Sequence, residues 1–355
     1  MSSEPATVAP SGAEGVAQGR MDQFDTPARN ELAAAAWKTV TPFVDIDLPL
    51  PDRREGKVRV SYALGEDRRL IVTTDRLSAF DRVIAGVAYK GQVLNELSAW
   101  WFARTADVVA NHVVAVPDPN LLVARAATTL PVEVVVRGYI TGVTETSLWQ
   151  PYAAGARTIY GHHFADGLRK NSALARPIVT PTTKPPAGSA VHDEPLTSTE
   201  VVDRKLVEPR RWDDVTAAAL ELFRRGQEVT AAAGLLLVDT KYEFGLAADG
   251  ELLLIDELHT PDSSRYWIAD SYEDRLAAGE EPESLDKEVV RRALADAGFR
   301  GDGDLPDLPA GVWSATTNRY IDAFQRLSGR PFRPGRYPVG DRLLGLLDDI
   351  TKEFA

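Results

Sequence analysis

The sequence predicts an α+β or α/β fold, because strand patterns dominate its first part and helix patterns alternate with strands later. Residues 58–64 alternate apolar and polar side chains, which is the period of a strand with one buried face. Several later segments carry apolar residues at the spacing of a helix face. With 355 residues, 44% of them hydrophobic and 26% charged, the chain has the composition of a globular protein large enough for two domains.

The first part of the chain predicts a hairpin, a helix and a long strand. Residues 58–64 form the first strand, Gly65–Asp67 the turn, and 69–75 the returning strand. Leucines and a tryptophan at helical spacing predict a helix over 92–106. The β-branched run over 130–142 predicts a further strand that ends in glycines.

The domain organisation follows from these patterns. Residues 1–30 are expected to form a flexible tail, because the first 20 are small, polar and interrupted by Pro and Gly. A β-rich region then covers 31–130, and a larger region with both strands and helices covers 131–355. The change between them is expected near 125–135.

The second part predicts one long loop and several helices. Residues 155–195 are rich in Gly, Pro and Thr and are expected to be loop-like, which in a compact protein favours a functional role. Helices are expected over residues 213–233, 284–297, 314–328 and about 340–354. Ser284 and Ser314 are the expected N-caps, and Gly329 is the expected C-terminal stop of the third of these helices.

The overall charge excludes several classes of partner. The 52 acidic residues outnumber the 40 Lys and Arg residues, which gives a net charge of −12. Proteins that bind nucleic acids without sequence preference, or anionic membrane surfaces, need a basic field, so neither partner is expected. The chain has no Cys, no apolar run long enough to span a bilayer and no visible secretory signal, so we expect a cytoplasmic protein.

Two carboxylates are expected to face each other across a hairpin. Asp249-Gly250 lies between two apolar alternating runs, which predicts a two-residue turn and places Glu243 directly opposite Asp256. Lys241 and Asp239 lie on the same face. Opposed carboxylates repel each other unless a cation lies between them, and Mg²⁺ bridging to phosphate oxygens meets that need. The alternative is a solvated polar face on which Lys241 pairs with one acid.

Three groups of side chains could bind anions. Lys57 and Arg59 point the same way from one strand, although two such cations are more often solvated. Arg137 ends an apolar strand beside glycines, with Ser147 shortly after it, and residues 262–265 place Asp-Ser-Ser-Arg in a loop after the carboxylate strand. Arg binds phosphate through two N–H groups while Ser hydroxyls satisfy the remaining oxygens. Each group alone is also compatible with ordinary turn chemistry.

Other common site types lack their motifs. None of the five His residues has the spacing of a zinc motif and there is no Cys, which argues against a zinc site. His192-Asp193 follows Lys184 in the long loop and is the one His-Asp pair of interest, with a surface turn as its alternative. There is no P-loop, GxGxxG fingerprint, GxSxG elbow or HRD catalytic loop.

Several longer motifs follow one another in a set order. They are GKVR (56–59), TDRLSAFD (74–81), KGQVLNELSAWWF (90–102), PVEVVVRGYITG (131–142), PIVTPTTK (177–184), HDE (192–194), VDTKYEFG (238–245), IDELHTPDSSRYW (255–267) and DKEVVR (286–291). In this order they closely resemble the phosphoribosylaminoimidazole-succinocarboxamide synthase (SAICAR synthetase) family, over roughly residues 35–330.

The resemblance implies an α+β fold, with a β-rich N-terminal ATP-binding lobe, a larger α/β lobe and the active-site cleft between them. It implies an ATP- and Mg²⁺-dependent ligase of purine biosynthesis. Such enzymes join L-aspartate to 5-amino-1-(5-phosphoribosyl)imidazole-4-carboxylate and release ADP and phosphate. The implied partners are these small molecules, and a monomer and a homo-oligomer fit the sequence equally.

The resemblance also implies roles for individual residues. Lys57 and Arg59 would contact the ATP phosphates, and Glu133 and Val134 would lie near the adenine. Glu243 and Asp256 match the metal-associated carboxylates. The implied catalytic residues are Lys184, Lys241, His192 and Asp193. The implied contacts to the ribonucleotide are Ser78, Asp81, Arg137, Ser147, Asp262, Ser264 and Arg265.

Val60 departs from the family pattern, and three other functions fit parts of the sequence. Family members commonly carry an acid at this position. The alternation of Val60 with Tyr62 predicts a packing role, and the alternative is the loss of an acid near the nucleotide. A specialised relative in nucleoside-antibiotic or related metabolism would use the same acyl-phosphate chemistry on another azole ribonucleotide. A small-molecule kinase would stop at phosphoryl transfer. A nucleotide sensor would not need the complete set of candidate catalytic residues.

Overall fold

The computed structural model describes residues 40–355 except 81, 185–192, 300 and 302. The predicted tail (1–30), Asp81 and His192 therefore lie outside the described residues. Two five-stranded sheets dominate this part of the chain, and every strand pair in them is antiparallel. Of the two classes that the sequence pattern left open, the fold is thus α+β. Within the described ranges, no helix is both long and apolar enough to cross a membrane.

The first sheet contains the predicted hairpin. Its strand order is β1 (Arg54–Glu55), β2 (Arg59–Leu64), β3 (Arg68–Thr73), β7 (Leu121–Arg125) and β6 (Val113–Asp118). The turn between β2 and β3 is Gly65–Asp67, as predicted, and Gly65 adopts a φ of 67°, which glycine does without strain.

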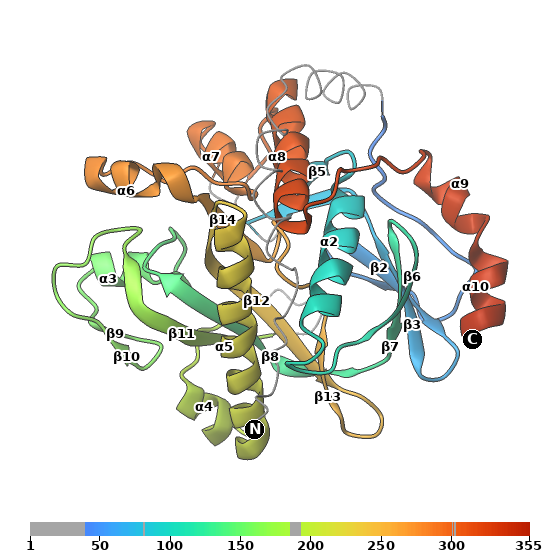
Figure 1. Cartoon of the computed structure of the whole chain (residues 1–355), viewed down its shortest axis with the longest axis horizontal. Helices are drawn as coiled ribbons and strands as arrows, with labels where there is room; N and C mark the ends of the chain where they lie inside the picture. Colours follow the sequence, from blue (N-terminus) through green and yellow to red (C-terminus); the bar gives the residue numbers. More distant parts are fainter. Residues whose placement is uncertain (1–39, 81, 185–192, 300, 302) are drawn as a thin grey trace, which may run out of the picture. The chain divides into compact units, whose positions relative to one another are not determined.

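Val60 and Tyr62 point into the apolar core beneath the first sheet, and both are fully buried. The packing role predicted for Val60 is therefore correct. The helix predicted over 340–354 forms as two shorter helices, α9 (Val339–Leu344) and α10 (Leu347–Phe354). Both pack against this core, so the end of the chain returns to the first sheet (Figure 1). The division into lobes near residue 130 stays a prediction, and any such division must assign α9 and α10 to the first sheet.

The second sheet has β12 at its centre. The strand order is β11 (Ala173–Thr183), β8 (Thr128–Tyr139), β12 (Leu235–Leu246) and β13 (Leu252–Ile255), and β14 (Ser264–Ile268) also pairs with β12. The long helix α5 (Pro209–Ala232) covers one face of this sheet (Figure 1). Even-numbered residues of β8 and β12, such as Val134 and Tyr242, are buried on that face. The odd-numbered residues therefore point to the opposite face.

The loop predicted over 155–195 is wrong for nearly half of its described length, which forms strands. It contains β9 (Thr158–Ile159), β10 (His162–His163) and the eleven-residue strand β11. The prolines that suggested a loop, Pro177 and Pro181, are tolerated because β11 lies at the edge of the sheet, where a missing N–H does not interrupt a ladder on both sides.

The predicted helices exist, but their starts differ from the prediction. α2 (Lys90–Arg104), α5, α7 (Glu288–Asp296) and α8 (Ala310–Ser328) match the expected segments. Ser284 and Ser314 are not N-caps, since those positions belong to Lys287 and Pro309. Ser284 instead forms a bridge to Trp267, so the chain there is held beside β14 and α7 starts later. Gly329 ends α8 with a φ of 66°, as predicted.

The remaining elements are short. They are β4 (Arg76–Ala79), β5 (Arg82–Gly86), α3 (Trp149–Ala153), α4 (Ser198–Asp203) and α6 (Ala269–Ala278). α4 begins with a capping box in which Thr197 and Glu200 each bond the other's backbone N–H. The sequence patterns did not predict these elements.

The contact between α5 and the second sheet leaves no room beyond a hydrogen atom at Gly226. A Cβ there would lie 2.2 Å from His259 Cε1 and 2.5 Å from a Leu237 methyl carbon. Gly226→Ala is therefore expected to lower the free energy of unfolding by about 1–3 kcal/mol, despite the higher helix propensity of Ala. Gly311→Ala in α8, where a Cβ meets nothing within 4 Å, is the control and should not destabilise the protein. Chemical denaturation checks both, and equal stability of the two variants would contradict the packing argument.

Candidate active site

The face of the second sheet opposite α5 carries a continuous row of charged side chains. The antiparallel register pairs Glu243 with Glu133, and Asp239 with both Arg137 and Arg265. These two groups are separated by four residues along β12, or ~13 Å at about 3.3 Å per residue. The face thus has two ends, which we call the carboxylate end and the arginine end.

The carboxylate end is built around Glu243. Lys241 Nζ donates to Glu243 Oε1 at 2.9 Å and to Glu133 Oε1 at 2.6 Å, and Lys184 Nζ pairs with the other oxygen of Glu243. Lys184 and Lys241 remain 30% and 33% exposed, so a ligand can reach both ammonium groups. The structure therefore brings together four of the residues singled out in the sequence.

The two glutamates of this end differ in their pKa shifts. Burial alone would raise the pKa of Glu243, but Lys241 and Lys184 outweigh burial and hold it below its usual value. For Glu133, burial is the larger effect and raises the pKa, with Lys241 only partly offsetting it. The exposed Asp193 also raises the pKa of Glu133, which indicates that Asp193 lies near the carboxylate end.

Asp256 joins this end, although not by the predicted hairpin register. Glu243 pairs with Ile255, and the hydrogen bond from Ala247 N–H to Glu251 O continues the same register. The loop between the strands is therefore 248–250, one residue longer than predicted. The predicted pairing of Glu243 with Asp256 is therefore wrong, because the register is shifted by one residue. Asp256 follows the end of β13 with a φ of 68°, so its backbone leaves the ladder there.

Arg59 connects Asp256 to the first sheet. It lies at the first position of β2, pairs with Asp256 through Nη1, and approaches Glu257 at 3.5 Å through Nη2. Burial opposes ionisation of Asp256, but Arg59, with Lys241 and Lys184, holds the pKa of Asp256 well below its usual value. This ion pair is a direct link between the two sheets at the carboxylate end.

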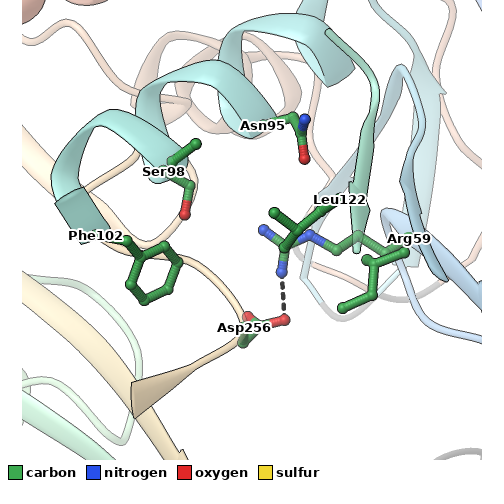
Figure 2. A pocket seen from close by; sticks show the side chains of 8 residues that line it. Arg59, Asn95, Ser98, Phe102, Leu122 and Asp256 are labelled. Atoms are coloured by element: carbon green, nitrogen blue, oxygen red, sulfur yellow. Dashed lines mark hydrogen bonds and ion pairs between the residues drawn. The ribbon is translucent and has the colours of Figure 1, made fainter. Parts of the chain in front are cut away.

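A small polar cavity lies behind the Arg59–Asp256 pair. Its volume is about 10 Å³, the size of one water molecule, and Asn95 and Ser98 of α2 line it together with the ion pair (Figure 2). Ser98 Oγ accepts a hydrogen bond from Leu258 N–H at 2.9 Å. Ser98 of α2 thus fixes the chain that follows Asp256.

The arginine end contains two guanidinium groups and one carboxylate. Asp239 Oδ2 lies 3.0 Å from Arg265 Nη1 and 3.7 Å from Arg137 Nη1. Arg137 also donates to Thr180 Oγ1 and to the Thr146 carbonyl, both at 2.8 Å. The structure therefore brings Arg137 and Arg265 together, as the sequence analysis expected of a shared anion site.

The hydroxyls of Ser147 and Ser264 each have a partner within the protein. Ser147 Oγ accepts from Gln150 N–H at 3.3 Å at the start of α3. Ser264 pairs with Thr240 in the ladder, and the two hydroxyls are 2.8 Å apart. Because consecutive strand residues alternate, Ser264 points to the face opposite Arg265.

Asp262 is occupied by partners that the sequence analysis missed. Its carboxylate accepts from Lys90 Nζ at 2.7 Å and from Tyr320 Oη at 2.5 Å, and Lys90 is completely buried. Burial works against the ionised form, but Lys90 and then Lys287 outweigh it and lower the pKa of Asp262 to about 2. Asp262 thus ties its loop to α2 and α8. Lys90 begins the motif KGQVLNELSAWWF, but the spacing of residues in this motif does not indicate a partner 172 residues away.

The other predicted site residues lie in varied surroundings. Lys57 precedes β2 rather than lying within it. Val134 is buried on the α5 side, and Ser78 is half-buried in β4. Thr180, which binds Arg137, was also missed, because the sequence predicted a loop there.

Comparisons with known proteins identify the family. The chain matches the sequence profile described as SAICAR synthetase over residues 52–307. It is 47% identical over 305 residues to the phosphoribosylaminoimidazole-succinocarboxamide synthase of Legionella pneumophila (strain Lens), covering 84% of this chain and 96% of that protein. SAICAR synthase from Saccharomyces cerevisiae, solved in complex with SAICAR, superposes with a TM-score of 0.70 at 29% identity, covering 82% of this chain and 99% of that one.

A more distant structure shares the fold. It is a type-2 SAICAR synthetase in complex with ADP, with a TM-score of 0.60 at 22% identity over 80% of this chain and all of that one. Fold and sequence together define an ATP-dependent carbon–nitrogen ligase. The chain belongs to the SAICAR synthetase family. The resemblance, the α+β class and the enzyme class predicted from the sequence are thus confirmed.

The buried Asp262 carboxylate makes stability depend on pH. Because its folded pKa of about 2 lies below the unfolded value, its contribution is complete above about pH 4 and is lost as the pH falls toward 2. Asp262→Asn should cost roughly 2 kcal/mol of unfolding free energy at pH 7, and the difference from wild type should shrink between about pH 4 and 2. Denaturant titrations at several pH values measure this.

The matched control for this prediction is Asp107→Asn. Asp107 also forms an ion pair, in this case with Arg225, but the Asp107 side chain is 63% exposed. Little change in stability is expected, because exposed ion pairs contribute little. A constant difference between wild type and Asp262→Asn across this pH range would contradict the assignment.

Proposed function

We propose that this face of the second sheet binds 5-amino-1-(5-phosphoribosyl)imidazole-4-carboxylate along its length and joins it to L-aspartate. The 5′-phosphate contacts Arg137 and Arg265, and the imidazole carboxylate reaches Lys184 and Lys241. The observation that carries this proposal is the ~13 Å separation of the two ends, which is comparable to the span of an extended mononucleotide. A bidentate cation at one end suits phosphate, and mobile ammonium groups at the other suit a reacting carboxylate.

The chemistry follows from the poor electrophilicity of a carboxylate. An oxygen of the imidazole carboxylate attacks the γ-phosphorus of ATP, the bond to the bridging oxygen breaks, and ADP leaves. In the resulting acyl phosphate, the aspartate amine attacks the carbonyl carbon and phosphate leaves. The amine loses a proton as the amide forms. Lys184 and Lys241 neutralise the oxygens that gain charge, so catalysis is mainly positioning and electrostatic stabilisation.

The carboxylate end also suits Mg²⁺. Glu243 and Asp256 offer the hard oxygen ligands that this ion prefers, and magnesium commonly uses one or two carboxylates together with substrate phosphates and water. Within the described ranges, no group of three or more His, Cys, Asp or Glu side chains is arranged to hold a metal ion. When bound, Mg²⁺ would neutralise phosphate oxygens. Lys57 and Arg59 would contact the same phosphates from the first sheet.

Two further roles belong to this proposal. The adenine lies near Glu133 and the backbone of Val134, because the Val134 side chain is buried on the opposite face of β8. Asp193 lies near the aspartate, and its influence on the pKa of Glu133 supports this placement. The role of His192 rests on the family resemblance alone. Asp262 and Ser264 fix the start of β14, which carries Arg265, since their side chains are engaged by Lys90, Tyr320 and Thr240.

The direct test is product formation. Protein, ATP, Mg²⁺, the imidazole carboxylate ribonucleotide and L-aspartate should yield the succinocarboxamide, detected by mass, with one ADP per amide. If ADP and a phosphorylated product accumulate in the presence of aspartate and no amide forms, the protein is instead a kinase. No product from a folded, ATP-binding protein would exclude this substrate and favour a related azole ribonucleotide.

The carboxylate end can be tested by neutral replacements. Glu243→Gln and Asp256→Asn should each reduce Mg²⁺-dependent turnover by at least about 100-fold, because the phosphates lose the ion that neutralises them. Calorimetric titration should show that Mg²⁺ no longer strengthens ADP binding. Glu251→Gln is the matched control, because Glu251 belongs to the same hairpin and pairs with Arg125 at the surface. Wild-type turnover in either of the first two variants would remove that residue from the metal site.

A further inference from the structure

Asp239 occupies an unusual position between two cations. In the register of the second sheet it is the backbone partner of Arg137 on β8 and also of Arg265 on β14. The three side chains therefore leave the same face. One oxygen, Oδ2, faces both Nη1 atoms, at 3.7 Å from Arg137 and 3.0 Å from Arg265. A single carboxylate oxygen is thus shared by two guanidinium groups.

A site built only to attract phosphate would have no carboxylate here. A phosphate monoester carries about −1.5 to −2 charges at pH 7, so Asp239 weakens the attraction that the two arginines exert. Its charge must therefore serve another purpose. The strands that carry the arginines lie on either side of β12, about 10 Å apart, and two guanidinium groups that converge on one ligand from there repel each other.

The surroundings show how the arginines are held. Arg137 is fixed from its other side by Thr180 and the Thr146 carbonyl, and its side chain is 10% exposed. Asp239 is 13% exposed, so its interaction with both arginines is only partly screened by solvent. The carboxylate draws both Nη1 atoms toward one point above β12, which places two N–H-bearing groups in a fixed relation before any ligand arrives.

We infer that Asp239 is a positioning residue for the phosphate of the ribonucleotide, acting by orienting Arg137 and Arg265 rather than by touching the substrate. The inference rests on the proposed binding of the phosphate by these arginines. A bidentate contact to an anion depends on the orientation of the guanidinium planes. Holding both groups in that orientation therefore favours phosphate binding more than the negative charge of Asp239 weakens it.

The test is a steady-state comparison of Asp239→Asn with wild type. The variant keeps the side-chain shape and removes the charge. The KM for the ribonucleotide should rise at least about tenfold, while kcat and the KM values for ATP and L-aspartate change less than about threefold. If Asp239 only reduced the positive charge of the site, the KM for the ribonucleotide would fall instead. A fall, no change, or an equal rise in all three KM values would overturn the inference.

Two comparisons separate this inference from the proposed function. Arg265→Met should raise the KM for the ribonucleotide, and the double variant Asp239→Asn with Arg265→Met should show less than the product of the two single effects, because Asp239 acts through Arg265. If Arg265→Met leaves this KM unchanged, the phosphate assignment itself fails. If Arg265→Met raises it and Asp239→Asn does not, only the role of Asp239 is overturned.

A control excludes a general loss of structure. Asp118→Asn removes another buried carboxylate paired with an arginine, Arg342, whose Nε lies 2.6 Å away. It should lower the melting temperature without a selective change in the KM for the ribonucleotide. Should Asp239→Asn fail to fold, Asp239→Glu keeps the charge and displaces the carboxylate by one methylene. It should still raise this KM selectively, and an unchanged KM in that folded variant would overturn the inference.

Discussion

The alternation of side chains along β12 is the constraint on which the rest of the structure depends. This strand pairs with β8, β13 and β14, so its backbone is held on both sides. Because successive side chains must point to opposite faces, Tyr242 and Phe244 are driven into the core under α5 while Lys241 and Glu243 are driven to the other face. The same residues that stabilise the sheet therefore fix the order and spacing of the charged groups.

The charged face is neutralised locally, which explains how an acidic protein can be specific for anions. At the carboxylate end, Glu133 and Glu243 are matched by Lys184 and Lys241, and Asp256 is matched by Arg59. Each cation is held by a partner of opposite charge at a defined place. The net charge of −12 offers no general attraction for phosphates, so in the proposed function recognition depends on these few cations and their geometry.

Patterns local in sequence predicted much of this molecule. Strict alternation predicted the β2–β3 hairpin and the burial of Val60, and helical spacing predicted α2, α5 and α8. The ordered motifs predicted the family. The register of the β12–β13 hairpin was wrong because the Asp-Gly pair forms part of a longer loop, in which Gly250 N–H bonds to Ala247 O.

Contacts between distant segments could not be predicted in this way. Lys90 pairs with Asp262, and Arg59 pairs with Asp256, only because the two sheets and α2 pack together. The residues adjacent in sequence do not indicate either pairing. The sequence did not predict the edge strand β11, because its prolines favour a loop. Proline is tolerated in a strand only where one hydrogen-bonding edge of that strand has no neighbour.

The return of α9 and α10 to the first sheet has a consequence for how the protein folds as it is synthesised. The apolar face formed by Val60, Tyr62 and Leu70 is covered by residues such as Leu343 and Ile350, almost 300 positions later in the chain. The strands of the first sheet are complete at Arg125, but α9 begins only at Val339. The apolar face of this sheet therefore stays uncovered while residues 126–338 are synthesised, a condition that exposes a nascent protein to aggregation.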